Sequence, residues 1–193
     1  MKKFALIGAA GYIAPRHMKA IKNTNNNLIA AFDRFDSVGV IDSYFPEADF
    51  FTEPERFDRY LSKLNANSNS VDYVSICSPN YLHMYHIKFA LRNKLNVICE
   101  KPLVLNNSDL DEIKIYENIY NSRVNSILQL RLHPSIRDFK NIVQSPKNKN
   151  KKFEIELTYI TSRGNWYLKS WKGIDHKSGG VATNIGIHFY DML

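Results

Sequence analysis

The sequence is poor in cysteine and contains no long apolar run. Its 193 residues include only two cysteines, Cys77 and Cys99, and each follows a short apolar stretch. Two thiols in such positions are typical of small buried residues and not of a disulfide framework, so we expect a reducing, cytoplasmic location. No run approaches the roughly 18 apolar residues that a membrane-spanning helix needs.

A signal peptide is also missing from the first residues, although they imitate one. Lys2 and Lys3 precede an apolar stretch at residues 4–14, but Gly8 and Gly11 interrupt it. A secretion signal would carry a small-x-small cleavage site after a helical apolar segment, and none follows here. We therefore expect a strand and a turn in this segment.

The composition lacks the biases of fibrous and disordered chains. Hydrophobic residues make up 44% and charged residues 23%, which is typical of globular proteins. The formal net charge is +7, and the lysine-asparagine run at residues 147–152 accounts for four of these charges. Because that run has no interleaved aromatic residues and no recognition helix, we expect a solvated loop, with neither nucleic acid nor a membrane as partner.

Apolar strand patterns alternate with helical patterns along the first two thirds of the chain. The predicted strands are residues 4–7, 28–32, 71–77, 95–99 and 124–130, and the predicted helices are 12–22, 54–64, 81–91, 109–120 and 136–143. Alternation of this kind favours right-handed crossovers and a parallel sheet with nearly continuous apolar strands. The fold class predicted for this part is α/β, with a doubly wound parallel (Rossmann) sheet.

The pattern changes after the lysine-asparagine run. Residues 153–161 alternate between apolar and polar side chains, which predicts a half-buried strand of a different sheet, and a helix is predicted from Thr183 or Asn184 onward. One strand and one helix cannot enclose a core. We therefore expect a dinucleotide-binding domain at 1–131 and, at 132–193, the truncated start of an incomplete α+β open-sheet domain of a larger subunit.

A glycine turn follows the first predicted strand and opens the first helix. Glycine permits a tight turn, small residues let backbone N–H groups approach a pyrophosphate, and the helix N-terminus favours negative charge. The turn departs from the G-x-G-x-x-G pattern, because Ala10 and Ile13 stand where the second and third glycines would be. A plain strand-to-helix turn would also explain Gly8 and Gly11.

An acidic residue at the end of the second strand strengthens the dinucleotide interpretation. Asp33 stands 22 residues after Gly11, close to the offset at which a carboxylate accepts hydrogen bonds from the ribose hydroxyls. Its charge would repel a 2′-phosphate, so NAD is favoured over NADP. Arg34 leaves an alternative open, since a guanidinium could receive that phosphate or stack on adenine.

Polar residues also follow the third and fourth predicted strands of the sheet. Ligands of open α/β sheets bind at the carboxyl ends of strands, and Lys101 should point into that crevice because it stands between a buried strand and a stiff proline. The candidate cofactor-binding residues are Gly8, Ala10, Gly11, Tyr12, Ile13, Asp33, Arg34, Ser78, Pro79, Asn80, His83, Glu100, Lys101 and Gln129.

Two histidines three residues apart on a predicted helix raise the question of a metal site. No carboxylate or thiol with ligand spacing accompanies His83 and His86. We therefore expect no metal, a polar contact for His83, and surface exposure or packing for His86.

Taken together, these motifs resemble those of the Gfo/Idh/MocA oxidoreductases. The resemblance covers the whole chain and extends through Gly179, Gly180 and the segment from Asn184 to His188. It implies that Lys101 holds the reacting hydroxyl and that His188 is the acid/base. Many members carry an aspartate four residues before this histidine, where this chain has Asn184, so the share of His188 relative to Lys101 in proton transfer stays open.

Within that family, residues 8–17, 36–39, 165–168 and 170–173 resemble enzymes of lipopolysaccharide O-antigen synthesis. Those enzymes oxidise the sugar C3 hydroxyl of a UDP-N-acetylglucosaminuronate with NAD, and family members commonly form homo-oligomers through the second domain. Such a substrate is an anion, and cationic and aromatic side chains suit it. The candidate substrate-binding residues are Lys101, Arg163, Asn165, Tyr167, Lys172, Lys177, Asn184 and His188.

Other functions remain as alternatives at this point. The chain could be another nucleotide-sugar or polyol dehydrogenase of the same family, or a non-catalytic nucleotide-binding remnant. The glycine turn also approximates that of the extended short-chain epimerases and dehydratases, but those enzymes need a Tyr-x-x-x-Lys pair. No tyrosine of this sequence has a lysine four residues later.

Overall fold

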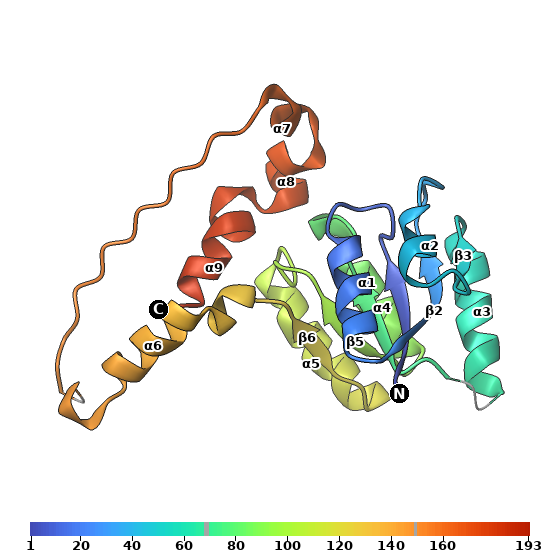
Figure 1. Cartoon of the computed structure of the whole chain (residues 1–193), viewed down its shortest axis with the longest axis horizontal. Helices are drawn as coiled ribbons and strands as arrows, with labels where there is room; N and C mark the ends of the chain where they lie inside the picture. Colours follow the sequence, from blue (N-terminus) through green and yellow to red (C-terminus); the bar gives the residue numbers. More distant parts are fainter. Residues whose placement is uncertain (68–69, 149) are drawn as a thin grey trace. The chain divides into compact units, whose positions relative to one another are not determined.

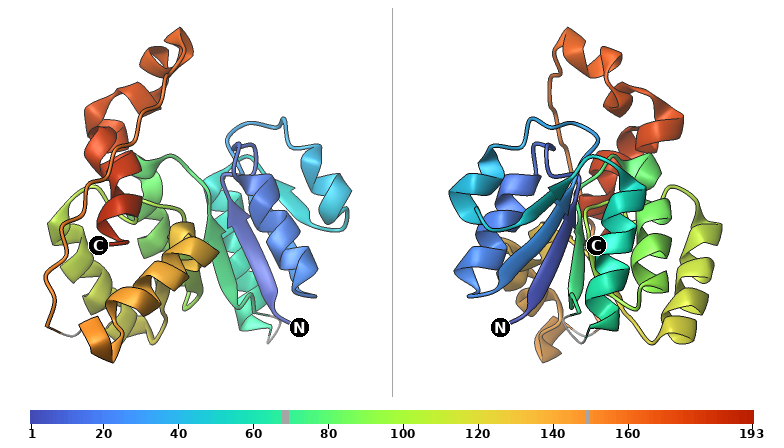
Figure 2. Two further views of the ribbon diagram at one scale, coloured as in Figure 1. Left: turned by 60° about the vertical axis from the view of Figure 1, so that its left-hand side comes forward. Right: turned by 90° about the vertical axis from the view of Figure 1, so that its right-hand side faces the viewer.

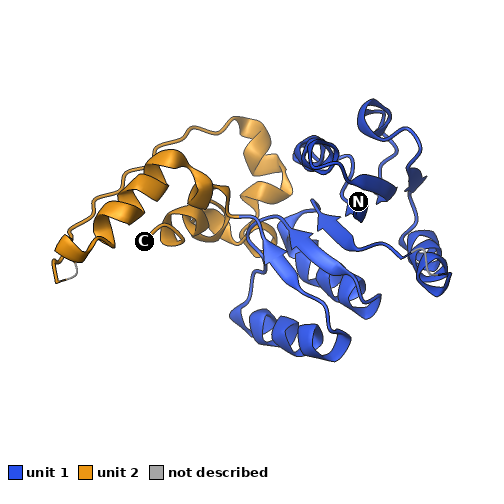
Figure 3. Ribbon diagram, turned by 60° about the horizontal axis from the view of Figure 1, so that its bottom comes forward, with its two compact units in different colours: residues 1–127 blue, residues 128–193 orange. Residues whose placement is uncertain are grey.

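The computed structural model describes residues 1–67, 70–148 and 150–193, which form two compact units (Figures 1 and 3). Unit 1 is Met1–Ile127 and unit 2 is Leu128–Leu193. The sequence-based domain boundary, between residues 131 and 132, stays a prediction. No helix among the described residues is both long and apolar enough to cross a membrane.

Unit 1 contains a six-stranded parallel sheet, which confirms the predicted fold class. The strands stand in the order β3-β2-β1-β4-β5-β6, and every neighbouring pair is parallel. The chain therefore reverses its direction of winding between β1 and β4. Their bounds are β1 Lys3–Ile7, β2 Asn27–Phe32, β3 Asp49–Phe51, β4 Tyr73–Ile76, β5 Asn96–Cys99 and β6 Val124–Ser126.

Helices cover both faces of this sheet (Figure 2). On one face α1 (Ala14–Asn23) and α2 (Val40–Tyr44) bury Met18 and Ile41 against Leu6 and Leu28. On the other face lie α3 (Pro54–Ala66), α4 (His83–Arg92) and α5 (Asn107–Tyr120). Each fully buried large apolar side chain contributes about 1.5–3 kcal/mol, so this double layer fixes the strand ends on which the site stands.

Two short elements of unit 1 were missed by the sequence analysis. The strand β3 has only three residues and pairs with β2 at the edge of the sheet, and α2 has five residues. Both are too short to show a hydrophobic period. The predicted helix at 81–91 also begins differently, because a 3₁₀ turn at Asn80–Leu82 precedes α4.

Unit 2 is built mostly from short helices. They are α6 (Pro134–Val143), α7 (Asn165–Lys169), α8 (Asp175–Ser178) and α9 (Ile187–Tyr190), and a π-helical turn at Ala182–Gly186 leads into α9. In the lysine-asparagine run, Pro146–Asn148 form a 3₁₀ turn and Lys151 is exposed, whereas Lys149 lies outside the described residues.

The half-buried strand predicted at residues 153–161 is not formed. The segment has no regular secondary structure and all nine residues are exposed, including Phe153, Ile155 and Leu157 at 42–48%. Alternation determines which side chains share a face, but a strand also needs a neighbouring strand for its hydrogen bonds. The described residues of unit 2 provide no such neighbour.

Candidate active site

The glycine turn after β1 is built as the sequence predicted and lies against the end of β4. Gly8 has φ +88°, and a Cβ atom there would stand 2.6 Å from the backbone nitrogen of Ser78. The Gly8 N–H donates to the Phe32 carbonyl at 2.8 Å, and the Gly11 N–H donates to the Gly8 carbonyl at 3.0 Å. Glycine is therefore required at position 8, because the backbones of two segments meet there.

Asp33, which directly follows β2, forms a hydrogen bond with this turn. Its Oδ2 atom accepts the Ala10 N–H at 2.9 Å and its Oδ1 atom accepts the Phe35 N–H at 3.0 Å. Only 9% of Asp33 is exposed. Each carboxylate oxygen has two lone pairs, so both oxygens keep capacity for ribose hydroxyls.

The side chains around the turn are accessible. Tyr12 is 81% exposed, and the Arg16 guanidinium stands over its ring at 5.8 Å. Arg34 is exposed and stands over the Phe35 ring at 5.0 Å, whereas Ile13 is half-buried at the start of α1. An anion at this helix start would meet the turn's backbone together with Arg16 of the first helical turn.

The segment after β4 packs beside the turn, and both of its histidines are buried. Ser78 Oγ and His86 Nδ1 lie 2.8 Å apart, and Asn80 is buried in the 3₁₀ turn that follows the half-buried Pro79. Burial, together with the neighbouring His83, lowers the pKa of His86 to about 4. Of the two outcomes left open for His86, the structure shows packing.

His83 is wholly enclosed between two backbone segments. Its Nδ1 atom lies 2.7 Å from the Pro102 carbonyl oxygen and its Nε2 atom 2.9 Å from the Ser78 carbonyl oxygen. Burial lowers the pKa of His83, although the two carbonyls and Glu100 act in the opposite direction. The polar contacts of His83 are thus with backbone carbonyls of two segments, and a neutral ring can donate to one of them at a time. No group of three or more potential metal ligands occurs among the described residues.

Glu100 and Lys101 follow β5 directly, and Glu100 is held by a residue that the sequence analysis missed. His17 Nε2 lies 3.0 Å from Glu100 Oε1, and His17 Nδ1 lies 2.6 Å from Ser75 Oγ. Glu100 Oε2 accepts the Lys101 N–H at 3.4 Å. The sequence pattern could have pointed to His17, because it is the polar residue on the otherwise apolar helical face formed with Ala14, Met18 and Ile21.

The Glu100 carboxylate is stabilised in its charged form. Burial raises its pKa, but the hydrogen bond and charge of His17, with the N–H and charge of Lys101, outweigh burial and hold the pKa below its usual range. Lys101, itself half-buried, stands between this carboxylate and Pro102. The end of β5 therefore presents a lysine next to a fixed negative charge.

Unit 2 carries the remaining candidates. Arg163 stands over the Tyr167 ring at 5.7 Å, and the Lys172 ammonium lies 5.5 Å from the Trp166 ring and 5.8 Å from the Trp171 ring. These pairs bring cations and aromatic rings together around α7, which begins at Asn165. Such pairs suit an anion attached to a flat ring.

The other unit 2 candidates are distributed along its helices. Lys177 lies in α8, Asn184 in the π-helical turn and His188 in α9. Asp191, three residues after His188, receives a bidentate hydrogen bond from Arg131. That hydrogen bond lowers the pKa of Asp191, and His188 lowers it further. Gln129 is exposed and belongs to unit 2, whereas the other cofactor candidates belong to unit 1.

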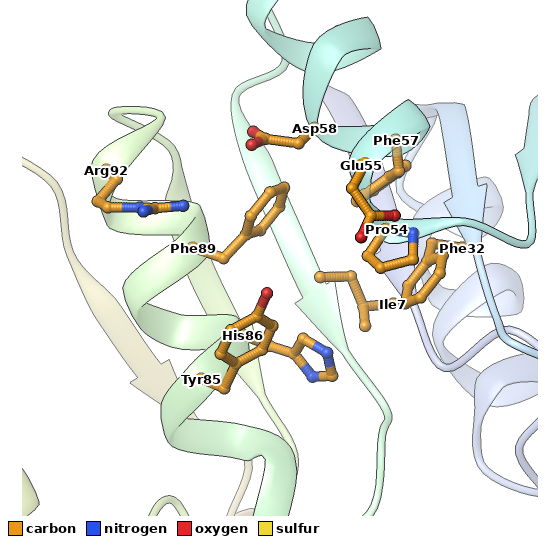
Figure 4. Close-up of a pocket in the computed structure, with 10 residues that line it drawn as sticks. All are labelled: Ile7, Phe32, Pro54, Glu55, Phe57, Asp58, Tyr85, His86, Phe89 and Arg92. Atoms are coloured by element: carbon orange, nitrogen blue, oxygen red, sulfur yellow. The ribbon is translucent and has the colours of Figure 1, made fainter.

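A small cavity lies between α3 and α4. Residues of α4 line one side, and residues of α3 with the ends of β1 and β2 line the other (Figure 4). Its volume of about 90 Å³ is far below the roughly 300–1,000 Å³ of ligand pockets. Its lining residues are Ile7, Phe32, Pro54, Glu55, Phe57, Asp58, Tyr85, His86, Phe89 and Arg92, without Lys101 or Asp33.

A parallel sheet with a glycine turn, an acid after its second strand and a lysine after its fifth strand is the arrangement of a dinucleotide-binding fold. Family models agree. Residues 2–126 match the NAD-binding Rossmann fold of the Gfo/Idh/MocA oxidoreductases, and residues 151–193 match the C-terminal alpha/beta domain of the same family. The chain belongs to this family, as its motifs predicted, and its cofactor is NAD.

Solved structures include a relative at high identity. The WlbA (WbpB) dehydrogenase from Thermus thermophilus, in complex with NAD and UDP-GlcNAcA, is 50% identical over the whole chain with a TM-score of 0.95. The WlbA dehydrogenase from Chromobacterium violaceum shares the fold at 20% identity, with full coverage of the chain and a TM-score of 0.82. The chain spans 62% and 54% of these two proteins.

Curated relatives are more distant. Glucose-6-phosphate 3-dehydrogenase of Bacillus subtilis is 25% identical over 202 aligned residues, which cover the whole chain and 53% of that protein. The 2,7-anhydro-N-acetylneuraminate hydratase of Escherichia coli is 33% identical over 62% of the chain and 32% of its own length. The chain thus spans about half or less of the curated relatives it matches.

Proposed function

We propose that the protein oxidises the C3 hydroxyl of UDP-N-acetylglucosaminuronic acid to the 3-keto sugar with NAD, in lipopolysaccharide O-antigen precursor synthesis. The observation that carries this proposal is the 50% identity over the whole chain to a dehydrogenase whose structure holds NAD and UDP-GlcNAcA. The Chromobacterium violaceum WlbA dehydrogenase was also solved with UDP-GlcNAcA, but at 20% identity it shows the fold alone, so the substrate assignment rests on the Thermus thermophilus relative.

The residues of unit 1 fit the cofactor. The Gly8 backbone approaches Ser78 closely enough to exclude any side chain, and the buried Asp33 oxygens face the same turn. NAD, when bound, supplies the acceptor for the hydride that leaves the sugar carbon. Asp33 would hold the ribose hydroxyls, and its charge would exclude a 2′-phosphate.

Lys101 and His188 supply the proton chemistry in this proposal. Removing hydride from a secondary alcohol carbon requires that its hydroxyl proton go to a base and that a cation stabilise the developing alkoxide. We assign the cation to Lys101, whose ammonium would hold the hydroxyl oxygen, and the base to His188. Asn184 would orient the imidazole or a sugar hydroxyl as a neutral amide.

The cation-aromatic pairs of unit 2 support an anionic substrate. A nucleotide sugar with a diphosphate and a carboxylate needs several cationic partners. Candidates are Arg163 over Tyr167, Lys172 over Trp166, and Lys177 in α8. Asn165, at the start of α7, adds an amide for sugar hydroxyls.

A second candidate substrate is glucose 6-phosphate. The Bacillus subtilis glucose-6-phosphate 3-dehydrogenase matches the whole chain, although at 25% identity. The two candidates share oxidation at C3 and differ in the anionic group, so they can be separated directly in one assay.

The test uses the full-length subunit. It is incubated with NAD and either UDP-N-acetylglucosaminuronic acid or glucose 6-phosphate, with and without 2-oxoglutarate, and the sugar is examined by mass spectrometry for the loss of two hydrogens. The 2-oxoglutarate arm is included because the Thermus thermophilus enzyme has also been solved with NAD and alpha-ketoglutarate. We expect oxidation of the UDP-sugar, and Lys101→Ala should abolish turnover while NAD binding is kept. Oxidation of glucose 6-phosphate alone, or of neither sugar, would reject the proposal.

We further infer a cytoplasmic location and a homo-oligomeric full-length subunit. The two free, buried cysteines support a reducing compartment, and the exposed apolar residues between 153 and 159 support assembly or burial by further chain. Light scattering on the full-length protein measures the oligomeric state, and a monomer would reject the second inference.

A further inference from the structure

Two buried histidines reach the Lys101 segment from opposite faces of the sheet. His17 belongs to α1 and His83 to α4, and these helices cover opposite faces (Figure 2). His17 bonds the side chain of Glu100, and His83 bonds the backbone of Pro102. The residue between the two held positions is Lys101.

We propose that His17 and His83 are positioning residues that hold the backbone on both sides of Lys101 and so direct its ammonium group. The role of Lys101 in this proposal rests on the function proposed above. The arrangement itself rests on contacts within unit 1.

The first half of this arrangement is a polar chain through an apolar layer. Ser75 on β4 contacts His17 at 2.6 Å, His17 contacts Glu100 at 3.0 Å, and Glu100 accepts the Lys101 N–H at 3.4 Å. The Nε2–H of His17 can donate to the carboxylate while Nδ1 faces the Ser75 hydroxyl. Glu100 is thereby fixed with one oxygen toward the helix and the other toward Lys101.

Burying these groups costs free energy that apolar residues would not cost. Ser75 is 2% exposed and His17 7%, and the Glu100 side chain is 16% exposed. A buried ion pair is often no more stabilising than well-packed apolar residues of similar volume. Since the neighbouring positions of α1 are Ala14, Met18 and Ile21, a leucine at position 17 would extend the apolar face. The polar chain is therefore better explained by its orientation of Glu100 and Lys101 than by a contribution to folding stability.

The second half fixes the carbonyl that follows Lys101. Both ring nitrogens of the fully buried His83 face carbonyl oxygens, those of Ser78 and Pro102. Burial lowers the pKa of His83 and so favours the neutral ring, which has one N–H to donate. In the tautomer that donates from Nδ1, the ring binds the carbonyl of Pro102, the residue after Lys101. With its own N–H bound by Glu100 and that carbonyl bound by His83, the Lys101 backbone is restrained on both sides.

The decisive experiment compares His17→Leu, His17→Gln, His83→Leu and Met18→Ala in the full-length enzyme. His17→Leu and His83→Leu should lower kcat by about 10-fold to 100-fold, because small misplacements of a reacting group have such effects. The KM for NAD should stay within about twofold of wild type. His17→Gln keeps an N–H that can reach the carboxylate, so it should restore part of kcat.

Met18→Ala is the matched control. Met18 is fully buried on the same face of α1 but takes no part in the polar chain, so its loss should lower Tm without lowering kcat. A kcat for His17→Leu no lower than that of Met18→Ala, or no recovery in His17→Gln, would overturn the proposal. If His17→Leu does not fold, His17→Gln and His83→Leu are compared with Met18→Ala in the same way.

A readout independent of turnover separates this proposal from the proposed function. If the wild-type enzyme does not oxidise the UDP-sugar, the proposed function fails, and hydrogen exchange of the Lys101 amide still tests the arrangement. Mass spectrometry of a peptide spanning residues 98–104 should show severalfold faster exchange in His17→Leu than in Met18→Ala. Equal rates in the two variants would overturn the role of His17.

Discussion

Asp33 Oδ2 and the Ala10 N–H lie 2.9 Å apart and are hydrogen-bonded, so the acid at the end of β2 and the turn after β1 form one unit. The same carboxylate accepts the Phe35 N–H at 3.0 Å. The acid that we propose to hold a ribose thus also fixes the turn beside which the pyrophosphate would bind. On that proposal, cofactor affinity and the local backbone depend on one side chain.

Asp33→Ala should weaken NAD binding about 10-fold to 100-fold, since hydrogen bonds to a charged group are worth about 1.5–3 kcal/mol. Asp33→Asn should lose less, because its amide oxygen can still accept one N–H. Calorimetric titration with NAD measures both. Asp36→Asn, an exposed acid nearby, is the control and should stay within about twofold of wild type. Equal losses in Asp33→Ala and Asp36→Asn would show that only general charge matters.

Gly8→Ala should destabilise unit 1 by about 3 kcal/mol or more. The added Cβ would meet Ser78 N at 2.6 Å and Cys77 carbonyl atoms at 2.7 and 2.8 Å, at a φ of +88°. Urea unfolding followed by fluorescence provides the measurement. Gly39→Ala is the matched control, because nothing lies within 4 Å of its Cβ position and its φ is −53°. A Gly8→Ala protein as stable as Gly39→Ala would contradict the structure.

His86 should make unfolding pH-dependent on the acid side. Its folded-state pKa is lowered from 6.5 to about 4, so between these values the unfolded chain binds a proton that the folded chain does not. The stability from neutral His86 is present above pH 6.5 and is lost as pH falls toward 4, by about 3 kcal/mol in total. In His86→Gln this loss should disappear, leaving the part due to His83. Parallel curves of unfolding free energy against pH for the two proteins would refute the prediction.

Lys172→Ala should raise the KM for the UDP-sugar about tenfold while leaving kcat nearly unchanged. Lys172 stands over Trp166 and Trp171, so its loss removes a cation from the cation-aromatic pairs and leaves the acid/base candidates intact. Initial rates at saturating NAD provide the test. Lys151→Ala removes an exposed lysine of the lysine-asparagine run and should change neither constant. An equal effect of the two substitutions would point to general electrostatic attraction.

Much of unit 1 could be predicted from local patterns. Tyr73–Ile76 is a short, mostly apolar run typical of a buried strand, and the apolar face of α1 repeats with the helical period. Gly8, Asp33 and Lys101 were placed correctly at strand ends, because parallel strands bring their carboxyl ends to one edge of the sheet. The short β3 and α2 were not predicted, since three and five residues are too few to show a hydrophobic period.

The sequence by itself determined the alternation of strands and helices, the glycine turn and the identity of the strand-end residues, because these depend on short-range pattern. Only the tertiary structure decided that His17 meets Glu100, 83 residues away, and that His83 meets Pro102, 19 residues away. It also decided that residues 153–161 do not form a strand among the described residues, although their alternation predicted one. Hydrogen bonds between distant segments depend on which neighbours the fold supplies, and a local pattern carries no record of those neighbours.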